Sequence, residues 1–301
     1  MAGPLAGLLL LSRPAALREW LWLLGTSALA AAWLLAPGGL AGQFERSAAV
    51  MLTGAFLALT LWRPLPLFRR AVLAVLATLA GLVLWGGVYD VGWRDVRAAK
   101  VQEWWAGYRA WAAMQGRTPV EGLPADAGAP ASVDEQMFAQ TAAAIESAAP
   151  IYPALLVLGA LLGLWVAWAW YHRIARRPLG LPAGRLADFR FSDQTLWLLV
   201  LALALLVTPA SPRMAPVGVE ALRDLGRNLL LVGAALYALR GLAVFWTAAR
   251  LAPRAIVATL AVVALFLFPF AAGGLTLLGV ADSWLDFRRR LASSTTGGYE
   301  R

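Results

Sequence analysis

The stretch "NLLLVGAALYALRGLAVFWTA" at residues 228–248 contains a single charged side chain, that of Arg240. A helix needs about 20 mostly apolar residues to cross the roughly 30 Å hydrocarbon core of a bilayer. This stretch meets that requirement, with Asn228 at its start. It therefore predicts a transmembrane helix with one charge inside it.

Similar apolar runs recur along the whole chain. The composition is 60% hydrophobic, with a mean hydropathy of +0.67. The fold class expected from this pattern is an all-α, polytopic integral membrane bundle of about seven transmembrane helices. The final run, at 255–280, contains Pro269, Gly273 and Gly274, so a kink or a partly re-entrant path is expected there. The other six expected spans are 20–36, 47–62, 71–89, 154–171, 194–208 and 255–280.

Residues 90–153 form the one long segment between expected spans, and they predict a helical extracytoplasmic insert. Aromatic residues follow helical spacing in its first half: Trp104, Trp105, Tyr108 and Trp111. This face has two interpretations, an amphipathic helix lying in the membrane interface or a helix packed on the spans or on its neighbour. A Pro/Gly/Ala connector at 116–131 and a capping box at 132–135 then predict a second helix to about residue 147.

The insert divides the chain into four expected parts. These are an N-terminal membrane part at 1–89, the insert at 90–153, a C-terminal membrane part at 154–291 and a flexible tail at 292–301.

The net charge of +9 comes mainly from arginines in short loops beside apolar runs. That placement is typical of topology control and of contact with anionic lipid headgroups, and nucleic acid is not expected as a partner. With the N-terminus in the cytoplasm, the short cytoplasmic loops hold twelve basic residues, against eight on the opposite side when the long 90–153 segment is left out of the count. That segment is net acidic, which agrees with its translocation. The N-terminus is therefore predicted to be cytoplasmic. Seven spans would, however, place Arg288, Arg289 and Arg290 outside.

Residue types exclude several kinds of chemistry. The chain has no cysteine and one histidine, His172, so disulfides, thiolate sites and the usual zinc sites are excluded. Nucleophile-elbow, zinc-protease and P-loop motifs are absent from the sequence. We expect a protein that is not an enzyme and that has no metal and no cofactor.

The sequence "DSWLDFRRR" at 282–290 closes the last apolar run. Asp282 and Asp286 would share a helical face, and such a pair could hold a divalent ion beside a phosphate. Ion pairing is the simpler interpretation, with Asp286 facing Arg289 and Arg290 at helical spacing. In that interpretation Trp284 and Phe287 seat the segment among lipid headgroups, and Arg288, Arg289 and Arg290 dock a lipid or a protein partner.

Arg240 lies about two turns inside its span, where an isolated charge costs a few kcal/mol. It could contact an anionic ligand or a neighbouring helix, or it could snorkel toward the side of Arg250. Asn228 could cap the helix or coordinate across the bundle.

The polar residues along 150–290 resemble the YybS-like family of bacterial polytopic membrane proteins, a domain of unknown function. The matching pieces are "WYHRIARR", "LPAGRLADFRFSD", "LGRNLLLVGAALYALRGLAVF" and "LGVADSWLDFRRR". Arg240 departs from the family pattern, in which this position usually looks like glutamine. Positions that match it include Asn228, Gly241, Gly279, Asp282, Trp284, Asp286, Phe287, Arg288 and Arg289.

The resemblance implies a bacterial inner-membrane protein, distantly similar to the substrate-binding subunits of energy-coupling-factor transporters. We therefore expect a transporter-like protein that binds a small solute through Asn228, Arg240 and Asp282. An ATPase module or another membrane protein would be its partner. The alternative is a scaffold or regulator in envelope assembly, with the Trp-rich helix and the basic loops as its interaction surfaces.

Overall fold

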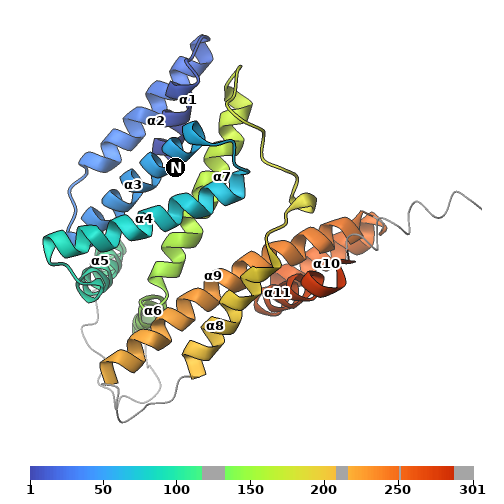
Figure 1. The fold of residues 1–301 in the computed structure, drawn as a ribbon. Helices are drawn as coiled ribbons and strands as arrows, with labels where there is room; N and C mark the ends of the chain where they lie inside the picture. Colours follow the sequence, from blue (N-terminus) through green and yellow to red (C-terminus); the bar gives the residue numbers. More distant parts are fainter. Residues whose placement is uncertain (117–132, 208–215, 251, 288–301) are drawn as a thin grey trace, which may run out of the picture. The chain divides into compact units, whose positions relative to one another are not determined.

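The computed structural model describes residues 1–116, 133–207, 216–250 and 252–287, and every regular element in these ranges is helical (Figure 1). The chain divides into two compact units, unit 1 (Met1–Ala183) and unit 2 (Gly184–Arg301). This boundary falls inside the predicted C-terminal membrane part at 154–291. Unit 1 contains α1 (Ala2–Leu11), α2 (Leu17–Leu35), α3 (Leu40–Trp62), α4 (Leu67–Tyr89), α5 (Trp93–Met114), α6 (Val133–Ala148) and α7 (Tyr152–Ile174). Unit 2 contains the short 3-10 turns η1 (Leu186–Asp188) and η2 (Asp193–Thr195), followed by α8 (Leu196–Val207), α9 (Pro216–Ala249), α10 (Arg254–Phe266) and α11 (Phe268–Leu285).

Among the described residues, five helices are long and apolar enough to cross a membrane. Large apolar side chains on them face outward; Val83 is 75% exposed and Leu277 72% exposed. Lipid rather than water suits such a surface. The predicted all-helical, polytopic membrane class is confirmed, with five helices of spanning length where about seven were expected. They are Leu40–Trp62, Leu67–Tyr89, Tyr152–Ile174, Gly218–Ala249 and Phe268–Leu285.

The core of unit 1 is built around α1. Leu8 and Leu9 on this ten-residue helix have no exposed surface, and they pack in a cluster with Phe56 of α3 and Trp168 of α7. With ten residues, α1 is too short to cross a bilayer. In the structure, the other helices of unit 1 bury this segment.

In unit 2, α9 packs against α11 in a parallel arrangement. Three contacts link residues that are each 42 positions apart: Thr276 with Ala234, Gly279 with Tyr237, and Asp282 with Arg240. Because the offset stays the same along both helices, α9 and α11 run in the same direction. By contrast, α8 is antiparallel to α9, since Gly226 approaches Ala202 and Leu205, whereas Gly233 approaches Leu199.

This arrangement corrects the expected single span at 255–280. The helix breaks at Leu267, so that α10 has 13 residues and α11 has 18. Because α11 is parallel to α9, α10 must carry the chain back toward the start of α9 before α11 begins. Helices α10 and α11 therefore form a helical hairpin. At 1.5 Å per residue, α10 is about 20 Å long, which is short of a full crossing. Both the start of α10 and the end of α11 lie toward the C-terminal end of α9.

The two helices of the insert lie where the sequence predicted them, with α6 ending one residue beyond the expected 147. The connector at 116–131 and its capping serine, Ser132, lie outside the described residues, apart from Gly116. The aromatic face of α5 packs partly on α6, because Trp105 and Tyr108 lie 5.3 and 6.2 Å from the ring of Phe138. Trp104 meets Tyr152 edge-on at 5.9 Å, and Trp111 is 37% exposed. These contacts favour the packed interpretation of the face.

Gly241 and Gly279 bring the backbones of α9 and α11 into direct contact. A Cβ atom added at Gly279 would overlap the carbonyl oxygen of Tyr237, and one at Gly241 would overlap that of Leu275. Side-chain-free positions of this kind allow membrane helices to approach closely.

We predict that Gly279→Ala separates α9 from α11 and lowers the free energy of unfolding by about 1–3 kcal/mol, as overpacking does in other cores. Gly273→Ala is the matched control, since nothing lies within 4 Å of a Cβ at that position of α11. The control should be neutral or slightly stabilising because alanine favours helix more than glycine does. Thermal unfolding of both purified variants in one detergent tests this; equal melting temperatures would contradict the close contact.

Candidate functional site

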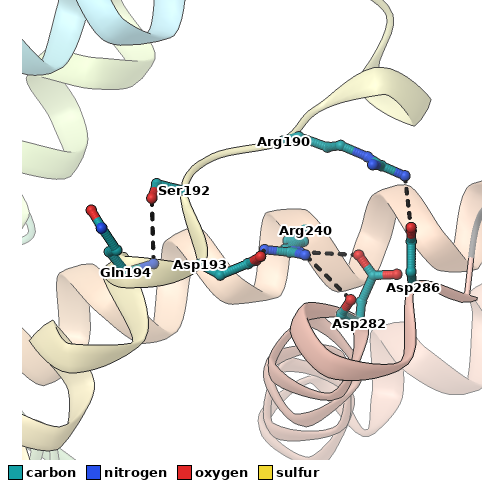
Figure 2. Close-up of polar contacts among 7 residues, drawn as sticks. All are labelled: Arg190, Ser192, Asp193, Gln194, Arg240, Asp282 and Asp286. Atoms are coloured by element: carbon teal, nitrogen blue, oxygen red, sulfur yellow. Dashed lines mark hydrogen bonds and ion pairs between the residues drawn. The ribbon is translucent and has the colours of Figure 1, made fainter.

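The strongest polar cluster in unit 2 centres on Arg240, which lies nine residues before the end of α9 and is 6% exposed. Its Nε atom donates to Oδ2 of Asp282 at 3.0 Å, and one Nη donates to the backbone oxygen of Asp282 at 3.3 Å. The other Nη donates to Oδ1 of Asp193 at 2.8 Å. Figure 2 shows the guanidinium between the end of α11 and the turn that opens α8. The sequence predicted Arg240 and Asp282 as site residues, and the structure brings them together.

An aromatic pair flanks the same guanidinium. Its carbon lies 5.5 Å from the ring centre of Phe191, and Phe191 meets the ring of Tyr237 edge-on at 5.1 Å. A cation over an aromatic face gains roughly 0.5–2 kcal/mol, with the larger value in dry surroundings. Arg240 is therefore held by two carboxylates and one aromatic face, and these contacts favour helix pairing over simple snorkelling.

The charges of this cluster do not balance. One guanidinium faces two carboxylates, and the side chain of Asp282 is fully buried whereas that of Asp193 is 66% exposed. The three groups together carry a net charge of −1, so Arg240 needs no further anion to neutralise it. The cluster is better suited to a cationic or hydrogen-bonding group than to an anionic one.

Two hydroxyl groups next to the ion pair are buried without a hydrogen-bond partner among the described residues. They belong to Tyr237 of α9 and Ser283 of α11, which are neighbours but do not meet in a hydrogen bond of normal geometry. An unsatisfied buried hydroxyl costs about 1–3 kcal/mol. These two groups are available to a ligand or a water molecule.

Asp286 forms a separate ion pair with Arg190, at 2.9 Å (Figure 2). It caps α11 in the left-handed conformation, with φ of 41°, so it does not continue the helical face of Asp282. The expected partners Arg289 and Arg290, and Arg288 beside them, lie outside the described residues. Each carboxylate of the D-xxx-D pair thus pairs with its own arginine. No group of three or more potential metal-ligating side chains occurs in the described part of the chain.

Asn228 is not part of this cluster. It lies twelve residues before Arg240 on α9, about 18 Å along the helix axis, and its amide donates to the backbone oxygen of Asp224 at 2.7 Å. Helix α9 begins at Pro216, so Asn228 does not cap it either. Near the other end of the site, Trp284 is 71% exposed, as an anchor among headgroups would be, and Phe287 is half-buried.

A second polar cluster lies in unit 1, between the insert and the spans. Lys100 of α5 is 9% exposed and pairs with Glu45 at 2.9 Å and Glu103 at 3.1 Å, and Tyr152 donates to Glu45 at 2.5 Å. Burial lowers the pKa of Lys100, but its hydrogen bonds to the two carboxylates outweigh burial and raise the pKa above its ordinary value. Trp93 stacks on Tyr152 at 5.8 Å. This cluster joins α3, α5 and α7 and has its donors and acceptors well matched.

Sequence reasoning missed four residues of the Arg240 cluster, namely Phe191, Asp193, Tyr237 and Ser283. Tyr237 is one helical turn before Arg240, and that spacing was a usable signal. Asp193 is 47 positions from Arg240, and nothing local indicates that contact.

The fold and this cluster define a polytopic helical membrane protein with a buried ion-pair network. The chain belongs to the family described as "Predicted membrane protein (DUF2232)", whose model matches residues 120–283. The match includes Arg240 and Asp282 but ends before Trp284 and Asp286. No curated protein and no solved structure matches the chain.

We predict that Asp282→Asn lowers the free energy of unfolding by about 3 kcal/mol, because it leaves a buried guanidinium with one exposed carboxylate. Asp193→Asn should cost below about 1 kcal/mol, since its side chain is 66% exposed. Arg240→Gln combined with Asp282→Asn should cost less than the sum of the single changes, because both charges are removed. Denaturation of these three purified variants and of Arg240→Gln alone measures the costs; additive costs of the two single changes would show that Arg240 and Asp282 are not coupled.

Proposed function

We propose that this protein is a transporter-like membrane protein that binds a small solute beside the Arg240 cluster. The observation that carries the proposal is the pair of buried, unsatisfied hydroxyls of Tyr237 and Ser283 next to Asp282. Polar groups at such depth in a membrane protein are costly and commonly mark substrate paths. The broken helix at Leu267 supports the same idea, because interrupted helices form the binding sites of many transporters.

The charges of the cluster restrict the solute. A net charge of −1 and two hydroxyl groups favour a solute with an amine or several hydrogen-bond donors. An anionic solute would be repelled by Asp193 and Asp282. We infer a binding role rather than catalysis, because the cluster offers a satisfied ion pair and no activated nucleophile.

A ligand screen tests the solute proposal. Purified protein is exposed to a panel of water-soluble vitamins, amines and amino acids while its melting temperature is followed, and a solute at 100 times its Kd should add about 2.7 kcal/mol of stability. Tyr237→Phe should abolish this ligand-dependent stabilisation while leaving the protein without ligand equally stable or slightly more so, since it removes an unsatisfied hydroxyl. Tyr89→Phe, at a 64% exposed position, is the matched control. A stabilising solute whose effect survives Tyr237→Phe would place binding elsewhere.

We further propose that the protein lies in the inner membrane of a bacterium, with its N-terminus in the cytoplasm. Arginine counts then put Arg250 and Arg254 in the cytoplasm as well. The α10–α11 hairpin returns the chain to that end of α9, so the tail with its three arginines would also be cytoplasmic. This topology removes the conflict that a seventh crossing would create.

Accessibility of single cysteines distinguishes the two topologies, and the cysteine-free chain makes the labelling clean. Ser147→Cys, at an exposed position of the insert, should react with an impermeant maleimide on intact cells. Ser293→Cys should react after permeabilisation alone. Labelling of Ser293→Cys from outside, at the level of Ser147→Cys, would mean that 255–280 makes a full crossing.

The second candidate function is a membrane scaffold or regulator of envelope assembly. An open groove of about 440 Å³ on the insert favours it, with a mainly apolar lining: Trp104, Met137, Gln140, Thr141, Ala144, Ile145 and Ala148. Exposed apolar grooves are typical of protein contacts. Co-purification separates the two candidates, since an ATPase module as partner supports transport and the proposed likeness to energy-coupling-factor subunits. Envelope-assembly proteins recovered without an ATPase would support the scaffold.

A further inference from the structure

Arg70 is a second buried arginine, located in unit 1 on the first turn of α4, and it is 3% exposed. One Nη donates to the backbone oxygen of Leu65 at 2.7 Å, and the other donates to Oγ1 of Thr60 at 3.3 Å. The guanidinium carbon lies 4.7 Å from the ring centre of Trp168 and 5.9 Å from that of Phe56. All of these contacts are with neutral groups.

Arg70 therefore differs from Arg240, because no carboxylate of the described residues forms an ion pair with it. Its Nε is buried and has no hydrogen-bond partner in that part of the chain. A buried charge without a counter-charge is strongly unfavourable. The interactions of the described residues of unit 1 leave the positive charge of Arg70 unbalanced.

The surroundings of Arg70 are positive as well. Glu19 is the single acidic residue in the three loops that meet at this end of unit 1, within 12–19, 63–70 and 172–183. Its carboxylate accepts backbone N–H groups of Arg176, Ala16 and Ala15 at 2.6, 2.9 and 2.8 Å, which lower its pKa to about 2. Eight arginines lie in the same loops: Arg13, Arg18, Arg63, Arg69, Arg70, Arg173, Arg176 and Arg177.

A short segment at 175–183 covers the guanidinium. The indole of Trp168 donates to the backbone oxygen of Leu181 at 3.1 Å, and the backbone N–H of Leu179 donates to the Tyr171 hydroxyl at 2.8 Å. Between them, Gly180 adopts φ of +74°, and a Cβ there would lie 3.4 Å from the Trp168 ring and 3.9 Å from a nitrogen of Arg70. The backbone bond from Arg176 to Glu19 and a 3.4 Å contact between His172 Nε2 and the carbonyl oxygen of Gly180 also hold this segment, which separates Arg70 from the arginine-rich surface.

We propose that Arg70 is the centre of a binding site for a phosphate group, reached beneath the segment 175–183. A phosphate supplies the counter-charge that the described residues around Arg70 do not provide, and the fork of guanidinium N–H groups matches phosphate oxygens. The group is the headgroup of an anionic lipid or a free phosphate ion. Arginines of the surrounding loops draw it in from the membrane surface. This site is independent of the solute proposed for unit 2.

The lipid arm of the test uses the full chain in nanodiscs that contain phosphatidylglycerol and phosphatidylcholine, with native mass spectrometry of the lipid retained on the protein. Wild-type protein should retain phosphatidylglycerol preferentially, and Arg70→Gln should reduce that retention at least tenfold. Arg69→Gln is the matched control, because it removes one of the eight loop charges at an exposed neighbouring position and leaves the buried guanidinium of Arg70 in place. The control should change retention less than twofold.

The phosphate arm uses nanodiscs of phosphatidylcholine alone and follows the melting temperature as inorganic phosphate is added, with chloride at equal ionic strength as the reference. A phosphate-specific rise that is absent in Arg70→Gln identifies the free ion as the ligand.

Arg70→Lys covers the case in which Arg70→Gln does not fold, since it keeps the charge but not the guanidinium fork. It should fold and show a severalfold weaker preference in whichever arm responds. Wild-type levels of binding in both Arg70 variants would overturn the proposal. So would an equal loss in Arg69→Gln, or the absence of a wild-type response in both arms.

Discussion

The close contact between the backbones of α9 and α11 is the constraint on which unit 2 depends. Because Gly241 and Gly279 have no side chains, the two helices pack backbone to backbone at one fixed register, in which Tyr237 contacts Gly279 and Gly241 contacts Leu275. That register places Asp282 beside Arg240. It also requires α11 to run parallel to α9, so α10 must return the chain between them. Helix pairing, hairpin and ion pair are therefore consequences of one contact.

Two buried arginines show how differently a membrane protein can treat the same charge. Arg240 has two carboxylates within 3.0 Å, whereas Arg70 has carbonyl, hydroxyl and aromatic partners. A buried ion pair contributes little net stability, but removing one partner is expensive. The pair at Arg240 therefore enforces one pairing of α9 with α11. No described carboxylate pairs with Arg70, and the proposed phosphate would supply that missing counter-charge.

Much of the fold could be predicted from hydropathy and helical spacing, including the membrane class, the helices of the insert and the importance of Arg240 and Asp282. Hydropathy carries no direction, so the run at 255–280 could not reveal that its two halves are antiparallel. Pro269 and the glycine pair did indicate an interruption near Leu267. The pairing of Asp286 with Arg190 joins residues 96 positions apart, and local spacing instead suggested the arginines that follow it. Residues 1–11 were too few to span, and their burial depends on helices far along the chain.

Exposure changes steeply across the Arg240 cluster. The side chain of Asp193 is 66% exposed, that of Arg240 is 7% exposed and that of Asp282 is fully buried. One guanidinium nevertheless contacts both carboxylates. A cationic group arriving from water would meet Asp193 first and could compete with Arg240 for it. Displacing Arg240 from Asp193 leaves its bonds to Asp282 in place, so the helix pair need not separate. The hydroxyls of Tyr237 and Ser283 are buried beside the ion pair, where a hydrogen-bond donor or acceptor would stabilise them most. Binding of the proposed solute would therefore not require α9 and α11 to separate.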